Sequence, residues 1–362
     1  MAKLGDVCKK ATSNIAQKDL EGHHGNYPIY GASGFISNVD FYQQENPYIA
    51  IVKDGAGIGR VMKLPAKSSV IGTMQYIIPN DTVDIDYLAY AMEHMNLSKY
   101  FTGATIPHIY FKDYRKEELP LPPLYEQRKI AAVLDKVSDL IAKRRQQLDK
   151  LDELVKSRFI EMFGVYPANP MGWEIGTIRD IVTEVRYGSS RPAVDGGKYP
   201  YLRMNNITYG GELDLSDTKR IDIPDNELDK CTVRRGDVLF NRTNSKELVG
   251  KTCVYDRDEM MVLAGFVIRI RVKDRILPEF LSAFLNTDFS KHMLLGMCKT
   301  AIGQANINAQ ELQNIGLYLP PVELQRRFVQ FKKETDKSKL AIQKSLEKLE
   351  ILKKALMQKY FG

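Results

Sequence analysis

The sequence predicts an α+β fold with a pseudo-twofold internal repeat, in which two α/β blocks are separated by two long antiparallel helices that form a coiled coil. Two observations lead to this prediction. Residues 121–164 and 319–362 align without a gap at an offset of 198 positions, and 12 of their 44 positions are identical. Each copy has the apolar spacing of one long helix and follows a larger block with short strand-like segments. The expected order is block, helix, block, helix.

The first block, residues 1–120, has the pattern of a small α/β domain. Tyr48–Val52 and Gly59–Leu64 are strand-like, and a short helix is expected at Asp86–Met95. The glycine-rich segment Asp54–Arg60 lies between the two strands. Such a turn can hold a nucleotide phosphate only where a helix begins after it, but here another strand follows. We therefore expect a hairpin loop whose glycines let the backbone approach a partner.

Residues 121–164 are expected to form the first long helix. The Leu-Pro-Pro start suits an extended approach to the helix, because proline disfavours helix in the residue before it. Apolar residues then follow in alternating steps of three and four, which is a heptad seam. The seam consists of Ile130, Leu134, Val137, Ile141, Leu148, Leu151, Val155 and Met162, with Arg144 and Arg158 in its gaps.

The second block, residues 165–318, repeats the plan of the first. Asp237–Phe240 and Gly250–Tyr255 are strand-like and flank a polar loop. Ala264–Val272 alternates like a half-buried strand, and a short helix is expected at Pro278–Leu285.

Residues 319–362 are expected to form the second long helix. Its apolar stripe is less regular, because Lys332, Thr335 and Lys339 interrupt the upstream register. The stripe consists of Ile342, Leu346, Leu349, Leu352 and Leu356. A seam this narrow needs a partner, and the other copy can supply one in an antiparallel pair. About 38 residues at 1.5 Å each give a rod of roughly 57 Å, which would hold the two blocks at a fixed separation.

Composition excludes several classes of protein. The chain has 362 residues, enough for two or three domains, and 44% apolar with 27% charged residues is typical of a globular protein. No apolar run has the length of a membrane span, and the start lacks the apolar core of a signal peptide. The four cysteines are far apart without a CxxC pair, which argues against a zinc knuckle or a disulfide framework. We expect a cytoplasmic protein without membrane contact.

The net charge of +7 is unevenly distributed. The last 41 residues hold 11 Lys and Arg against 5 Asp and Glu, whereas residues 1–124 have a net charge of −1 and residues 165–321 are neutral. Any contact of the blocks with nucleic acid must therefore come from local basic clusters rather than from a broad field.

The polar loop of the second block is dense in amides, hydroxyls and cations. Arginine suits guanine edges and asparagine suits adenine edges in the major groove, while Ser, Thr and Lys suit phosphates. The candidate DNA-binding residues of this block are Asn241, Arg242, Thr243, Asn244 and Lys246 in the loop, Arg203, Asn205 and Asn206 in a second cluster, and Gln304 and Asn306 in a third. An ordinary polar hairpin loop has a similar composition. The presence of a loop at the matching place in the first block favours recognition.

The first block supplies its own candidates for DNA binding, which are His23, His24, Lys53, Arg60 and His108. The last of these lies in Gly103–Pro123, which aligns with Ala301–Pro321 at the same offset of 198. The adjacent histidines have no third ligand at usable spacing, so contact with DNA or solvent is favoured over a metal.

Catalytic signatures are absent from the sequence. Asn46-Pro47-Tyr48 lacks the second proline of the adenine-methyltransferase motif, and there is no nuclease-like carboxylate cluster, Walker loop or G-x-S-x-G. We therefore expect no catalytic residue, no bound cofactor and no metal site.

The tandem plan resembles the specificity (S) subunit of type I restriction–modification systems. The resemblance is carried by the repeated Leu-Pro-Pro-x-x-x-Gln-Arg start of each long helix and by the stretch 236–245, Gly-Asp-Val-Leu-Phe-Asn-Arg-Thr-Asn-Ser, leading to Val-Gly-Lys at 249–251. It implies target recognition domains at 1–120 and 165–318, which read the two halves of a split sequence in double-stranded DNA. It also implies spacer helices at 121–164 and 319–362.

The same resemblance implies a set of partners. Two methyltransferase subunits would dock on the helices and carry the S-adenosylmethionine, and restriction endonuclease/translocase subunits would join that complex. The chain itself would not be an enzyme. Our candidates for the docking surface are Leu140, Leu154, Phe159 and Phe331, although these side chains could equally thicken the helix–helix core.

Alternatives remain open at the level of the sequence. The loop at Asp54–Arg60 lacks the polar richness of the second loop, and a specificity subunit of a related type II system would look the same. A fused methyltransferase or nuclease with unrecognised motifs, or a coiled-coil scaffold without a role in nucleic-acid binding, are the competing classes.

Overall fold

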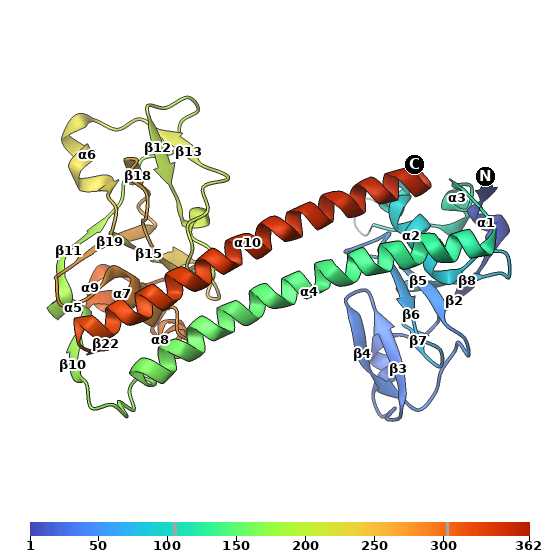
Figure 1. The fold of residues 1–362 in the computed structure, drawn as a ribbon, viewed down its shortest axis with the longest axis horizontal. Helices are drawn as coiled ribbons and strands as arrows, with labels where there is room; N and C mark the ends of the chain where they lie inside the picture. Colours follow the sequence, from blue (N-terminus) through green and yellow to red (C-terminus); the bar gives the residue numbers. More distant parts are fainter. Residues whose placement is uncertain (104–106, 302–303) are drawn as a thin grey trace. The chain divides into compact units, whose positions relative to one another are not determined.

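The computed structural model describes residues 1–103, 107–301 and 304–362, without the side chains of 299–301 and 304. The chain forms two compact units (Figure 1). Unit 1 consists of Met1–Gln146 and Gln343–Gly362, and unit 2 consists of Gln147–Ile342. Each unit therefore contains one α/β block and a segment of both long helices.

Unit 1 is built on two sheets. The first is antiparallel and has the order β2 (Cys8–Thr12), β8 (Met74–Pro79), β5 (Tyr48–Val52), β6 (Val61–Leu64). The second has the order β4 (Gly34–Val39), β3 (Tyr27–Gly31), β7 (Ser69–Val70), in which β3 and β7 are parallel. The remaining elements are β1 (Ala2–Lys3) paired with β9 (Glu118–Leu119), α1 (Leu4–Val7), η1 (Gln17–Leu20), α2 (Ile85–His94), η2 (Leu97–Tyr100) and α3 (Phe111–Tyr114).

Unit 2 repeats this topology. Its main sheet has the order β11 (Val182–Tyr187), β19 (Val267–Val272), β15 (Val238–Asn241), β17 (Thr252–Val254). The second sheet has the order β13 (Lys219–Ile221), β12 (Tyr199–Leu202), β18 (Met261–Leu263), β14 (Thr232–Val233), and its β12–β18 pair is parallel like β3–β7. The internal repeat and the α+β fold class are thus confirmed, with strand ends shifted by one or a few residues from the expected positions.

Further elements complete unit 2. A small sheet has the order β16 (Thr243–Asn244), β21 (Gln304–Asn306), β20 (Lys299–Ala301), and β10 (Glu174–Thr177) pairs with β22 (Gly316–Leu319). The short helices are α5 (Ile178–Ile181), η3 (Met204–Asn206), α6 (Asp225–Cys231), α7 (Pro278–Leu285), α8 (Asp288–Met297) and α9 (Ala309–Gln313).

The long helices α4 (Leu124–Phe163) and α10 (Val322–Phe361) pair antiparallel within each unit. In unit 1, Arg145 Nη2 lies 2.7 Å from Glu350 Oε1. In unit 2, the Phe159 and Phe328 rings lie 5.2 Å apart, and Lys339 Nζ forms an ion pair with Asp152. As the residue numbers of these contacts increase along α4, those along α10 decrease, which confirms the expected antiparallel pairing.

The identical glutamines of the repeat explain why the Leu-Pro-Pro-x-x-x-Gln motif recurs. Gln127 accepts a hydrogen bond from Asp84 N and donates to Thr82 O and Pro122 O. Gln325 accepts from Leu277 N and donates to Arg275 O and Pro320 O. Both side chains are fully buried. Each glutamine therefore joins the start of its long helix to the residue that precedes α2 or α7.

The identical C-terminal ends of the two repeat copies form a second junction. Phe361, at the end of α10, packs its ring 5.1 Å from Tyr87 of α2 in unit 1. Phe163, at the end of α4, packs 4.8 Å from Phe280 of α7 in unit 2. Each block is therefore held by the start of one long helix and the end of the other.

One part of the expected helical stripe is wrong. Leu352 is 46% exposed, and Lys353 lies on the inner face instead. The ammonium group of Lys353 pairs with Glu93 at 3.0 Å and lies over the Tyr90 ring. The aliphatic stem of a lysine can cover apolar surface while its charge finds a carboxylate, which a count of apolar residues does not detect.

Candidate DNA interface

The two hairpin loops that the sequence singles out occupy equivalent positions in the two units. The first loop residue in each case is a cation, Lys53 after β5 and Arg242 after β15. The amide of Lys53 donates to Thr73 O at 3.0 Å, and that of Arg242 donates to Phe266 O at 3.0 Å. Both cations are therefore held at equivalent positions by backbone hydrogen bonds, which do not depend on the identity of the side chains.

A second set of hydrogen bonds holds the first residue of each loop from its other side. Ile109 N donates to Lys53 O at 3.0 Å, and Ile307 N donates to Arg242 O at 2.9 Å. The next residues are also matched, because Asp54 contacts His108 in unit 1 and Thr243 Oγ1 contacts Asn306 Oδ1 in unit 2. The two partners, His108 and Asn306, lie 198 positions apart in the sequence, which is the offset of the repeat.

Each loop ends with a glycine followed by a cation. Gly59 and Gly250 have φ values of +79° and +80°, which favour glycine. Arg60 then donates to Ala32 O at 2.9 Å, and Lys251 Nζ donates to Met204 O at 3.0 Å. Both acceptors follow the equivalent strands β3 and β12. The cation therefore ties the loop of the main sheet to a loop of the second sheet in both units.

In unit 2 a cavity of about 560 Å³ lies beside these two loops, and residues 189–193 and 264–266 form much of its lining. Arg203, Asn205 and Arg242 contribute to its lining, together with the half-exposed Phe266. The guanidinium group of Arg242 lies 4.9 Å from the Tyr187 ring centroid, and Arg203 Nη2 pairs with Asp217 at 2.8 Å. The Nε atoms of both arginines are buried without a hydrogen-bond partner in the described structure. Guanidinium groups that line a cavity suit acceptors on base edges or phosphates.

Three residues expected to touch DNA are buried instead. The side chain of Asn241 is completely buried, Thr243 is 7% exposed, and Asn206 is 2% exposed. Asn206 donates to Asp214 O and accepts from Arg203 N. In this conformation these three side chains hold the loops in place rather than presenting groups to a ligand, because the loop backbone needs partners of its own.

The other second-block candidates remain at the surface. Asn205 and Lys246 are exposed, and Asn244 and Asn306 are half-buried. The side chain of Gln304 lies outside the described residues. Only some of the side chains that the sequence predicts to bind DNA are therefore within reach of a ligand.

The first-block candidates divide into two places. Lys53, Arg60 and His108 lie together at the loop. His23 and His24 precede β3, whereas the contact of Arg60 falls just after β3, at Ala32. His23 Nδ1 contacts Asp40 Oδ1 at 2.7 Å. A strand of five residues therefore separates the adjacent histidines from the loop.

Sequence reasoning missed Tyr187 and Lys291. Tyr187 lies at the end of β11, far along the chain from the loop that its ring supports, and only the strand register reveals the contact. Lys291 of α8 donates to Gly250 O at 2.7 Å. Burial, with the charges of Lys251 and Lys156, lowers the pKa of Lys291 to about 8, and burial also lowers the pKa of Lys251. A helical lysine gave no sequence signal for this contact.

Each unit thus joins one α/β block with a matched loop to segments of both long helices, which defines a duplicated α+β fold. The family model described as "Type I restriction modification DNA specificity domain" matches residues 1–153 and 170–353, and the chain belongs to this family.

Two curated relatives illustrate the similarity in sequence. The type I restriction enzyme MjaVIII specificity subunit of Methanocaldococcus jannaschii is 27% identical over 99% of this chain and 90% of that subunit. The EcoKI specificity subunit of Escherichia coli (strain K12) is 24% identical over 73% of this chain. The chain spans 61% of the length of the EcoKI subunit.

A solved structure supports the same fold. The S subunit of a type I restriction-modification system from M. genitalium aligns with a TM-score of 0.59 at 15% identity, over 100% of this chain and 95% of that one. Among the described residues, no helix combines the length and apolarity needed to cross a membrane, and no group of His, Cys, Asp and Glu could hold a metal ion.

Proposed function

We propose that this chain is the DNA sequence-specificity subunit of a type I restriction–modification complex and reads a bipartite target. The observation that carries this proposal is the pair of matched loops, 53–60 and 242–251, held by the same backbone bonds but bearing different side chains. A fixed frame with variable contents suits a protein that reads two different half-sites with one architecture.

Residues 1–120 and 165–318 are the proposed target recognition domains, and residues 121–164 and 319–362 are the proposed spacers. Each long helix has 40 residues, which corresponds to about 60 Å. An insertion of seven residues in both helices, beside the Arg145–Glu350 pair, preserves the heptad and adds roughly 10 Å. We expect about three extra base pairs in the spacer of the recognised site at 3.4 Å per base pair. An unchanged spacer length would contradict the role of the helices as a ruler.

The partners in this proposal are two methyltransferase subunits, joined by restriction endonuclease/translocase subunits. Leu140 and Leu154 are 44% and 47% exposed, which leaves them free for docking. Phe159 is 3% exposed and belongs to the core of unit 2, so the expectation that it faces a partner is wrong. Phe331 is half-buried beneath the guanidinium group of Arg158.

The chain is proposed to be non-catalytic, with S-adenosylmethionine bound by the methyltransferase subunits. Incubation of the purified chain with radiolabelled S-adenosylmethionine and DNA tests this point. We expect methyl transfer only when methyltransferase subunits are added, and native mass spectrometry should then show two of them per chain. Transfer by the chain alone would favour a fused enzyme, and a one-to-one complex would contradict the proposed stoichiometry.

A cleavage assay with the complete complex addresses a related type II system. Such a system also uses a specificity subunit, but it cuts on both sides of its site. Fixed cleavage next to the target by the assembled complex would favour the type II alternative.

A further inference from the structure

Unit 1 contains a small basic cavity to which the proposed function assigns no role. Its volume is about 230 Å³, and it lies beside the candidate loop, between β2, β8 and the segment that leads into α3. The lining includes four basic side chains, Lys10, Lys53, His108 and Lys112, together with Thr12 and the buried Gln75. Such a concentration of cations around a small space suits a compact anion.

The charge in this cavity is incompletely balanced. Lys53 lies 3.3 Å from Asp54, and the same carboxylate contacts His108. Within the described residues, Lys10 and Lys112 have no carboxylate within 4.0 Å, and the ammonium group of Lys112 lies 5.2 Å from the Tyr110 ring. Two lysines that line the cavity therefore have no counterion among the described residues.

The equivalent place in unit 2 is built differently. Thr12 pairs with Gln75 in the β2–β8 register, and Tyr187 pairs with Ile268 in the matching β11–β19 register. Tyr187 accepts a hydrogen bond from Ala309 N at 2.8 Å and supports Arg242 with its ring. Val185 takes the place of Lys10. An aromatic ring and an aliphatic side chain thus replace the open basic cavity of unit 1.

We propose that the unit 1 cavity binds a phosphate group of the DNA backbone next to the first half-site. This inference rests on the proposed function. A phosphodiester carries one negative charge on two oxygens that accept hydrogen bonds from lysine ammonium groups, and such contacts fix the position of a protein without reading sequence. Unit 1 would hold its half-site partly through this phosphate, whereas unit 2 uses the same space to support Arg242.

The first test measures DNA affinity against salt concentration for the assembled complex with its methyltransferase subunits. The double variant Lys10→Gln/Lys112→Gln should lower the slope of log affinity against log salt by about 1, the contribution of one phosphate contact. Lys9→Gln is the matched control, because Lys9 is the neighbouring exposed lysine of β2 and points to the opposite face of the strand. A slope equal to that of the wild type in the double variant, or an equal loss in Lys9→Gln, would overturn the proposal.

A second variant removes the space without removing charge. Thr12→Tyr copies Tyr187 from unit 2 and should fill the cavity, so the salt slope should again fall by about 1 while discrimination between target sequences stays unchanged. Thermal unfolding of each variant confirms that the chain remains folded. A Thr12→Tyr complex with the slope of the wild type would contradict the assignment.

The source of the phosphate is tested with modified DNA. Neutral methylphosphonate linkages are placed one at a time along the first half-site, and we expect one position to weaken binding of the wild type but not of the double lysine variant. Inorganic phosphate serves as the other arm. If inorganic phosphate shifts the NMR signals of Lys10 and Lys112 at millimolar concentration while no methylphosphonate position matters, the cavity is a site for free phosphate and the proposal is wrong. If the wild-type complex binds no DNA at all, the proposed function fails instead.

Discussion

Behind the hairpin loops 53–60 and 242–251, unit 1 and unit 2 fill equivalent places with different chemistry. In unit 1, Tyr48 and Tyr76 pack with their ring centroids 4.9 Å apart, and the Tyr76 hydroxyl accepts from Val70 N and donates to Gln43 Oε1. The strand registers place Asp237 at the position of Tyr48 and Arg269 at that of Tyr76.

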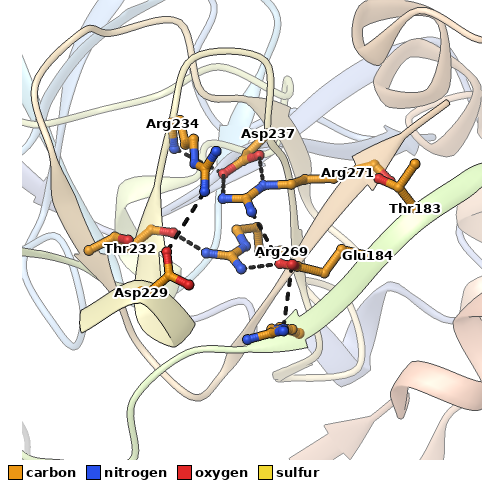
Figure 2. Close-up of polar contacts among 9 residues, drawn as sticks. Thr183, Glu184, Asp229, Thr232, Arg234, Asp237, Arg269 and Arg271 are labelled. Carbon is orange, nitrogen blue, oxygen red and sulfur yellow. Dashed lines mark hydrogen bonds and ion pairs between the residues drawn. The ribbon is translucent and has the colours of Figure 1, made fainter. Parts of the chain in front are cut away.

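A buried ionic network therefore replaces the tyrosine pair in unit 2 (Figure 2). Arg269 bonds to Thr232 O and Glu184, and Arg271 Nε bonds to Asp237 Oδ1 at 2.9 Å. Arg269 is 2% exposed. The hydrogen bond and charge of Arg269 outweigh the effect of burial, which alone would raise the pKa of Glu184, and hold that pKa below its ordinary value.

The comparison shows what the fold requires and what it leaves free. The backbone hydrogen bonds of Lys53 and Arg242 are the same in both units. So are the hydrogen bonds of Gln127 and Gln325, which we call the glutamine clamps. The side chains around these bonds differ between the units. A frame held by backbone groups tolerates changes in side chains both behind and within its loops. Such tolerance lets two copies of one domain carry different side chains at matched positions.

The largest expected loss of stability comes from a substitution in the ionic network of unit 2. Arg269→Met removes two charge-assisted hydrogen bonds of a buried guanidinium group, one to Thr232 O and one to Glu184, which should lower the unfolding free energy of unit 2 by about 3–5 kcal/mol. Tyr76→Phe, the matched change in unit 1, should cost only about 1–3 kcal/mol. The single tryptophan, Trp173, belongs to unit 2, so its fluorescence should follow the first change and not the second. Equal losses in both units would show that the two solutions are energetically alike.

The glutamine clamps should give the next largest effect, and a symmetric one. Gln127→Ala and Gln325→Ala each remove three hydrogen bonds from a fully buried side chain, so each should cost about 3 kcal/mol. Hydrogen exchange should show faster opening of α2 in the first variant and of α7 in the second. Opening of both helices in either variant would contradict the local nature of the clamp.

Substitution of the cation at the end of each loop tests whether the two units act on different half-sites. Lys251→Met should release the loop at Met204 and lower affinity for the second half-site by roughly tenfold, about the value of one base contact. Arg60→Met should do the same for the first half-site. Lys251→Arg keeps a donor at this position and should restore discrimination at the second half-site, whereas a loss caused by poor folding alone would not follow the half-site.

The last of these predictions concerns pH. The pKa of Lys291 falls from 10.5 to about 8 on folding, so the unfolded chain binds one more proton between these pH values. The group therefore costs stability at neutral pH, and this cost disappears as pH rises from 8 to 10.5. Lys291→Met should flatten the rise in unfolding free energy over this range, as measured by denaturant titration. An unchanged pH profile would show that Lys291 is well solvated.

Much of this fold follows from the sequence. The ungapped repeat predicts the long helices, and the spacing of apolar residues predicts most of the α4 seam. Three features could not be predicted. Asn241 and Thr243 look like exposed loop residues, but both are buried. Asn241 lies against the segment after β12, and Thr243 pairs with Asn306 of β21. The contact of Tyr187 depends on strand register, and Lys353 replaces Leu352 through an ion pair.

The most direct test of the central claim is a methylation map of DNA from cells that express the chain with its methyltransferase subunits. We expect a split motif whose two halves are separated by a spacer of fixed length. Arg242→Ala should relax one half, and Lys53→Ala should relax or weaken only the other. A contiguous motif, or a change in both halves from either variant, would contradict the account that each unit reads one half of the target.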